Sequence, residues 1–111
     1  MQKSFCPYGF VLLIFFLFIS CAGTPPKKEF ALARMALIAA SDAEASSLSP
    51  VEFEKAQDYM KLCERAFYER LYSNAKEYAL QARQFAEQAE AKALEKKKQS
   101  DFIIQNQEEK Q

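Results

Sequence analysis

The sequence predicts an all-α protein, a short three-helix arrangement that ends in an antiparallel helical hairpin. Between positions 29 and 98 the chain has no glycine and a single proline. Alanine, leucine, glutamate and lysine, which favour helices, dominate this stretch. Apolar residues also recur there at steps of three and four, the spacing that gathers side chains on one helical face. Together these two observations indicate helices that pack through apolar faces.

The first helix is expected from Glu29 to Ala45, where alanine, leucine and methionine are frequent. Its predicted inward face consists of residues spaced by three or four positions: Leu32, Met35, Ala36, Ala39 and Ala43. The helix should fade at positions 46–48, because two serines there compete for backbone hydrogen bonds.

The second helix is expected to begin at Ser49-Pro50-Val51-Glu52, a capping-box pattern. In such a box Ser49 caps the amide of Glu52, while Glu52 reaches back to the amide of Ser49. Proline at the first helical position loses no hydrogen bond. Leu48 and Phe53 occupy the positions of a hydrophobic staple, which fixes the angle at which the chain enters the helix.

The second helix has a bulky inward stripe at helical spacing: Phe53, Ala56, Tyr59, Met60, Cys63, Ala66 and Phe67. Because Cys63 lies on this stripe, we expect a buried and inert thiol, since free cysteine commonly packs as a small hydrophobe.

A turn is expected near Glu69 to Ser73, because the pattern changes after it. Alanines then follow at alternating steps of four and three, and we call them the alanine seam: Ala75, Ala79, Ala82, Ala86, Ala89 and Ala93. Small side chains let a neighbouring helix approach closely. The third helix is therefore expected from about Ser73 to about Lys98, folded back on the second, with Tyr78 and Phe85 beside the seam.

An alternative interpretation of the same residues is one unbroken helix from Pro50 to Lys98. Several copies would then assemble as a coiled coil, in the manner of the small trimeric murein-type lipoproteins. The heptad spacing of the seam favours this interpretation. Against it, an alanine seam alone buries little apolar surface.

The first residues have the three parts of an export signal. Lys3 supplies the positive charge, Phe10 to Ile19 form an apolar run, and Ser20 is the small residue at the cleavage point. The stretch Phe18-Ile19-Ser20-Cys21 resembles the lipobox of bacterial lipoproteins, which implies that Cys21 is acylated, by palmitate for example, and becomes the new N-terminus. An uncleaved anchor over 8–22 is the alternative, but that segment is short for a membrane span.

This pattern divides the chain into four parts. Residues 1–20 are the predicted signal peptide and 21–28 a lipidated N-terminus with a tether containing Pro25 and Pro26. Residues 29–98 form the helical domain. Residues 99–111 are a polar tail expected to be flexible, in which the apolar segment 102–104 either frays with its neighbours or docks on a partner or on the hairpin.

Composition excludes several function classes. After loss of Lys3, 14 basic side chains face 15 acidic ones, so no field of one sign is available to bind nucleic acid. The chain has no histidine, and only Cys63 is left as a free thiol, so we expect no metal site and no cofactor. Carboxylate pairs such as Glu52 with Asp58, or Glu64 with Glu69, lie in no evident pocket. We therefore expect no enzyme and no small-molecule substrate.

A family resemblance rests on Ser49-Pro50-Val51-Glu52, followed by Tyr72 and by alanines at positions 56, 66, 75, 79, 82 and 86. The stretch from about Phe30 to Ala93 resembles an uncharacterised alanine-rich domain of bacterial envelope lipoproteins, which implies a helix followed by a two-helix hairpin. That family usually has a glycine just before the tyrosine of the turn, where this chain has Arg70-Leu71. Ala22 after the cysteine resembles the sorting pattern for outer-membrane placement.

The expected function follows from these parts. We expect a lipid-anchored lipoprotein of the bacterial cell envelope, held at the outer membrane and facing the periplasm. Its role would be structural or that of an interaction module. Its partners would be the membrane, through the N-terminal lipid, and an envelope protein or further copies of the chain.

Overall fold

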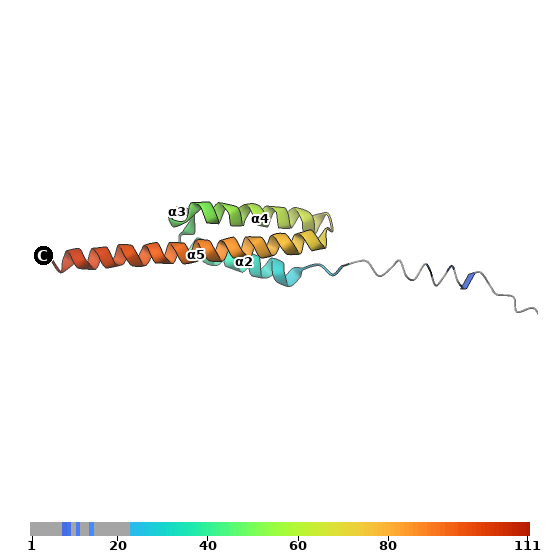
Figure 1. Cartoon of the computed structure of the whole chain (residues 1–111), viewed down its shortest axis with the longest axis horizontal. Coiled ribbons are helices and arrows are strands. Elements are labelled where there is room, and N and C mark those ends of the chain that lie inside the picture. The colour runs from blue at the N-terminus through green and yellow to red at the C-terminus, as the bar shows by residue number, and fades with distance from the viewer. Residues whose placement is uncertain (1–7, 10, 12–13, 15–22) are drawn as a thin grey trace, which may run out of the picture.

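The computed structural model describes residues 8–9, 11, 14 and 23–111. Within 23–111 the elements are α2 (Lys27–Asp42), α3 (Ala45–Leu48), α4 (Pro50–Tyr68) and α5 (Tyr72–Glu108), and no strand occurs there. The long helices lie side by side, with α5 between α2 and α4 (Figure 1). The all-α prediction and the C-terminal antiparallel hairpin are both confirmed.

Helix directions follow from pairs of contacts along the bundle. Lys76 of α5 approaches Glu29 at the start of α2, and Lys97 approaches Glu44 just after its end, so α2 and α5 are parallel. The α4 helix runs in the opposite direction and connects to α5 through a short turn (Figure 1). The turn lies at 69–71, within the predicted segment, and the alternative of one unbroken helix from Pro50 to Lys98 is wrong.

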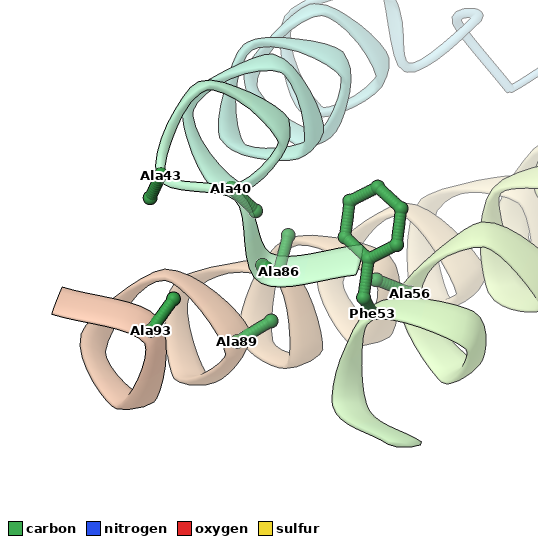
Figure 2. Packing of buried hydrophobic residues seen from close by; sticks show 8 residues of the cluster. Ala40, Ala43, Phe53, Ala56, Ala86, Ala89 and Ala93 are labelled. Carbon is green, nitrogen blue, oxygen red and sulfur yellow. The ribbon is translucent and has the colours of Figure 1, made fainter. Parts of the chain in front are cut away.

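The alanine seam of α5 forms the centre of the core. All six seam alanines are fully buried, and they contact α4 on one side and α2 on the other. Figure 2 shows Ala86, Ala89 and Ala93 of the seam next to Phe53 and Ala56 of α4, with Ala40 of α2 above them. Methyl side chains let all three backbones approach closely, and larger side chains from α2 and α4 then fill the remaining space.

The predicted stripe of α4 is the face that packs on the seam. Phe53, Met60 and Cys63 are buried, and Tyr59 stacks on Phe85 of α5 with ring centroids 5.5 Å apart. Leu48 packs against the cluster that contains Phe53, as the hydrophobic staple predicted.

The predicted inward face of the first helix is confirmed at Ala36 and Ala43, which pack in the core, and is wrong at Met35. Ala33 and Ala40 are fully buried against α5, whereas Met35 is 66% exposed. The α2 helix is apolar on nearly every side, so spacing alone does not decide which side faces inward. Because α2 lies close to the alanine seam, it packs there with the side that has the small residues Ala33 and Ala40. The chain then turns at 43–44 and forms the short α3 at the place where the first helix was expected to fade.

The third helix is longer than expected. It continues to Glu108, ten residues past Lys98, so most of the predicted tail 99–111 is helical. The last contacts of α5 with the bundle come from Lys96 and Lys97, and every residue after Lys97 is exposed. In Figure 1 this part of α5 extends past α3 as a single helix that ends at the C-terminus.

Candidate functional site

The predicted lipidation residue Cys21 lies outside the described residues, as does the rest of the segment 15–22. Description resumes at Gly23, and residues 23–26 are not helical. Pro26 is buried and precedes the first residue of α2, while the carbonyl of Pro25 accepts a hydrogen bond from the amide of Lys27 at 2.8 Å. The folded domain therefore begins at Pro26 and Lys27, inside the segment 21–28 that was predicted as the tether.

The start of the described chain lies beside the turn between α4 and α5. Gly23 lines a cavity of about 260 Å³ together with residues 70–74. That turn is at the opposite end of the bundle from α3 and from the exposed end of α5 (Figure 1). The two termini of the described domain thus lie at opposite ends of the bundle.

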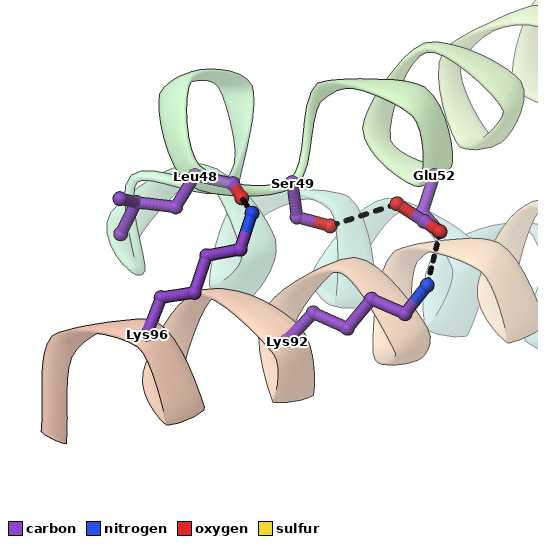
Figure 3. Close-up of polar contacts among 5 residues, drawn as sticks. All are labelled: Leu48, Ser49, Glu52, Lys92 and Lys96. Carbon is purple, nitrogen blue, oxygen red and sulfur yellow. Dashed lines mark hydrogen bonds and ion pairs between the residues drawn. The ribbon is translucent and has the colours of Figure 1, made fainter. Parts of the chain in front are cut away.

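The most connected polar group lies at the α3 end of the bundle. Lys92 of α5 donates a hydrogen bond to Glu52 of α4, and the hydroxyl of Ser49 donates to the other oxygen of Glu52 at 3.1 Å. One turn further along α5, Lys96 donates to the carbonyl of Leu48, the last residue of α3 (Figure 3). We call these five residues the polar bracket, because they join α5 to the junction between α3 and α4.

The predicted capping box is present in its residues but wrong in its bonds. The side chains of Ser49 and Glu52 bond to each other, Ser49 caps no backbone amide of α4, and the amide of Ser49 donates to the carbonyl of Ala45. The physical reason is Lys92, which comes from another helix and attracts the carboxylate of Glu52. The other oxygen of the carboxylate accepts a hydrogen bond from the Ser49 hydroxyl.

Glu52 has the largest electrostatic shift of this group. The hydrogen bond from Lys92, supported by the amide of Glu52 itself and by Ser49, lowers the pKa of Glu52 from 4.5 to about 2. A carboxyl group that stays ionised down to this pH is a poor general acid at neutral pH. Next to it, residues 50–52, 92, 95, 96 and 99 line an open hollow of about 670 Å³. The lowered pKa and the open hollow both fit a polar group that connects helices.

The carboxylate pairs considered from sequence are not assembled into a site. Glu52 is bonded to Lys92, whereas Asp58 lies 3.9 Å from Lys61 of its own helix. Glu64 and Glu69 are both exposed. Within the described part of the chain, no three residues of the types His, Cys, Asp and Glu gather in a way that would hold a metal ion.

Cys63 is buried, as its place on the α4 stripe predicted. Its thiol donates a hydrogen bond to the carbonyl of Ala75, 3.2 Å away, at the start of the seam. Burial, together with the charge of Glu64, raises the pKa of this thiol. A protonated thiol without access to solvent has little nucleophilic character.

Sequence reasoning did not find Lys92 and Lys96. No contact was predicted for either lysine, because their partners are 40 and 48 residues earlier in the chain. The one available signal was their spacing of four residues on one side of the seam, which places both side chains on the same face of α5.

Comparison with known proteins gives one match. Residues 28–102 match a family described as Domain of unknown function (DUF4398). No curated protein and no solved structure matches the chain. The matched residues contain α2 except its first residue, all of α3 and α4, the polar bracket and the complete alanine seam. Since they make up well over half of the 111 residues, the chain belongs to the DUF4398 family.

Proposed function

We propose that this protein is a lipid-anchored lipoprotein of the bacterial cell envelope, with a structural or protein-interaction role at the outer membrane, facing the periplasm. The observation that carries the proposal is the stretch Phe18-Ile19-Ser20-Cys21 behind a short apolar run. In this proposal the leader is removed and the Cys21 thiol carries the lipid.

The described domain supports this arrangement in two ways. The helical bundle starts at Lys27, after the non-helical residues 23–26, so a folded unit lies close behind Cys21 in the sequence. Among the residues that the structure describes, no helix is both long enough and apolar enough to cross a bilayer. An acyl chain at Cys21 would supply membrane attachment without any such helix.

The interaction role is supported by the exposed end of α5. Phe102, Ile103 and Ile104 are all more than half exposed, on a helical segment that packs against nothing in 23–111. Consecutive residues of a helix point in different directions, so these three side chains spread over more than half of the helix circumference. Such a segment favours a protein partner or another copy of the chain. A coiled coil through the alanine seam is not favoured, because the seam is occupied by α2 and α4.

The proposal is tested by the variant Cys21→Ser, expressed in a Gram-negative bacterium. We expect the unmodified protein to carry diacylglycerol and fatty acyl mass on a chain that begins at Cys21, and to fractionate with the outer membrane. In Cys21→Ser the acyl mass should be lost and the fractionation should change. Cys6→Ser is the matched control, because it removes a thiol from the predicted leader. An intact leader in the unmodified protein, or a mature start without acyl mass, would contradict the proposal.

A further inference from the structure

The outer face of α2 is apolar and uncovered along its middle, and the exposed Asp42 lies at its end. Met35 and Ile38 are 66% and 58% exposed, Ala31 is exposed beside them, and Leu32 and Ala39 lie half-buried at the flanks. These residues are on the side of the helix opposite Ala33 and Ala40, which pack on α5. A helix that is apolar on all sides is normally buried on all sides. The face therefore lacks its covering partner in the described domain.

We propose that this outer face of α2 lies on the surface of the phospholipid bilayer that holds the lipid anchor. The inference rests on the proposed function, because it assumes that Cys21 is acylated. It adds an orientation: the bundle lies along the membrane with α2 against the lipid, and α4 on the far side of α5 faces the aqueous phase.

The length of chain between anchor and helix supports this occupant. Cys21 precedes Lys27 by six positions, which span at most about 20 Å when fully extended. The 16 residues of α2 form a helix about 24 Å long. An acylated Cys21 thus keeps the first turn of α2 close to the headgroups.

The charges along α2 support a lipid surface as well. Lys27, Lys28 and Arg34 are exposed in the half of the helix nearer to Cys21. Glu29, the acidic residue of that half, turns toward α5 and lies 3.7 Å from Lys76. Exposed positive charges next to an apolar face are typical of helices that lie in the membrane interface, where they attract anionic headgroups.

A second copy of the chain fits this face less well. A standard protein interface uses about 20–30 residues on each side, whereas the outer face of α2 offers five apolar side chains along one helix. A bilayer can cover this face without a complementary shape, and the acylated Cys21 already holds the bilayer next to α2. Docking of a second copy on this face is therefore treated as one possible result of the experiment described next.

The test uses tryptophan, which the chain lacks. The full chain carrying Met35→Trp is produced in bacteria, purified from membranes and reconstituted into vesicles of phosphatidylcholine and phosphatidylglycerol. We expect a blue-shifted emission, quenching by phosphatidylcholine brominated near the headgroup end of its acyl chains, and several-fold weaker quenching by acrylamide than in detergent-free buffer. Leu62→Trp is the matched control. Leu62 is 39% exposed on α4, and its tryptophan should stay open to acrylamide.

The possible results separate the two proposals. A chain that floats with the vesicles while the tryptophan at position 35 stays open to acrylamide contradicts the docking of α2 and leaves the anchor intact. A chain that does not float contradicts both. Protection without quenching by brominated lipid, together with chemically cross-linked dimers, assigns the face to a second copy and overturns lipid docking. Ile38→Trp on the same face repeats the measurement, and circular dichroism checks that each variant is folded.

Discussion

Arg70 shows how a single residue ends a helix at a cost. Its φ of 59° is left-handed, a conformation that costs an L residue about 1–2 kcal/mol. The amide of Leu71 donates to the carbonyl of Ala66 at 2.8 Å and that of Arg70 to Phe67 at 3.2 Å, which is a Schellman ending. Glycine is the usual residue at this position because it has no side chain to clash.

The first prediction follows from this geometry. Arg70→Gly should stabilise the protein by about 0.5–1 kcal/mol, because relief of the left-handed strain exceeds the added flexibility of the unfolded chain. Urea unfolding followed by circular dichroism measures the change. Glu69→Gly is the control, since Glu69 has a right-handed conformation with φ of −77° and should gain nothing. Equal effects at the two positions would show that strain at Arg70 is unimportant.

The second prediction concerns Glu52 and pH. Its folded pKa is lowered from 4.5 to about 2, so the unfolded chain binds the proton at higher pH than the folded one. The stability contributed by Glu52 is then fully present above about pH 4.5 and is lost as the pH falls toward 2. In Glu52→Gln this part of the pH dependence should disappear. Urea unfolding between pH 2 and 6 measures it, with Glu54→Gln on the exposed side of α4 as the control.

At the scale of helices, the seam determines the fold because its side chains are small. Both α2 and α4 approach α5 along alanines that are completely buried. Methyl groups contribute little apolar area, so the stability comes from larger side chains that close over them, such as Phe53 and Met60. The seam therefore controls helix distance, and the aromatic and sulfur-containing side chains supply most of the burial.

The third prediction tests this role of the seam. Ala82→Leu should destabilise the bundle by about 1–3 kcal/mol, because the added atoms force the helices apart. Ala91→Leu is a matched control, as Ala91 is an exposed alanine of the same helix, and its effect should stay within about 0.5 kcal/mol. Thermal unfolding of both variants provides the measurement. A tolerated Ala82→Leu would mean that α5 and its neighbours are not closely packed at this point.

The sequence predicted those elements whose signals are local. The hairpin followed from the alanine spacing, and the start of α4 from Ser49 and Pro50. The inward face of α2 was predicted only in part, because apolar residues lie on most sides of this helix and their spacing does not single out Ala33 and Ala40. The end of α5 was missed since glutamine, glutamate and lysine continue a helix and no proline or glycine follows Lys98. The polar bracket depends on residues far apart in sequence, and only the folded chain brings them together.

At the scale of the whole domain, the two parts of the core are joined through α2. One cluster contains Phe53 and the last three seam alanines, and the other contains Met60, Cys63 and the first three. Leu37 of α2 packs against both clusters. The α2 helix contacts α5 far more than it contacts α4. The first helix therefore shares one core with the hairpin through the seam. The domain should unfold as one cooperative unit.

The last prediction tests that cooperativity. Leu37→Ala should lower the free energy of unfolding by about 1–2 kcal/mol, less than for a fully buried leucine because Leu37 is half-buried. Since unfolding is cooperative, native-state hydrogen exchange should accelerate by the same factor at core amides of α2, α4 and α5. Met35→Ala on the outer face of the same helix is the control and should change neither quantity in the absence of lipid. Faster exchange confined to α2 would show that α4 and α5 form a hairpin that is stable without it.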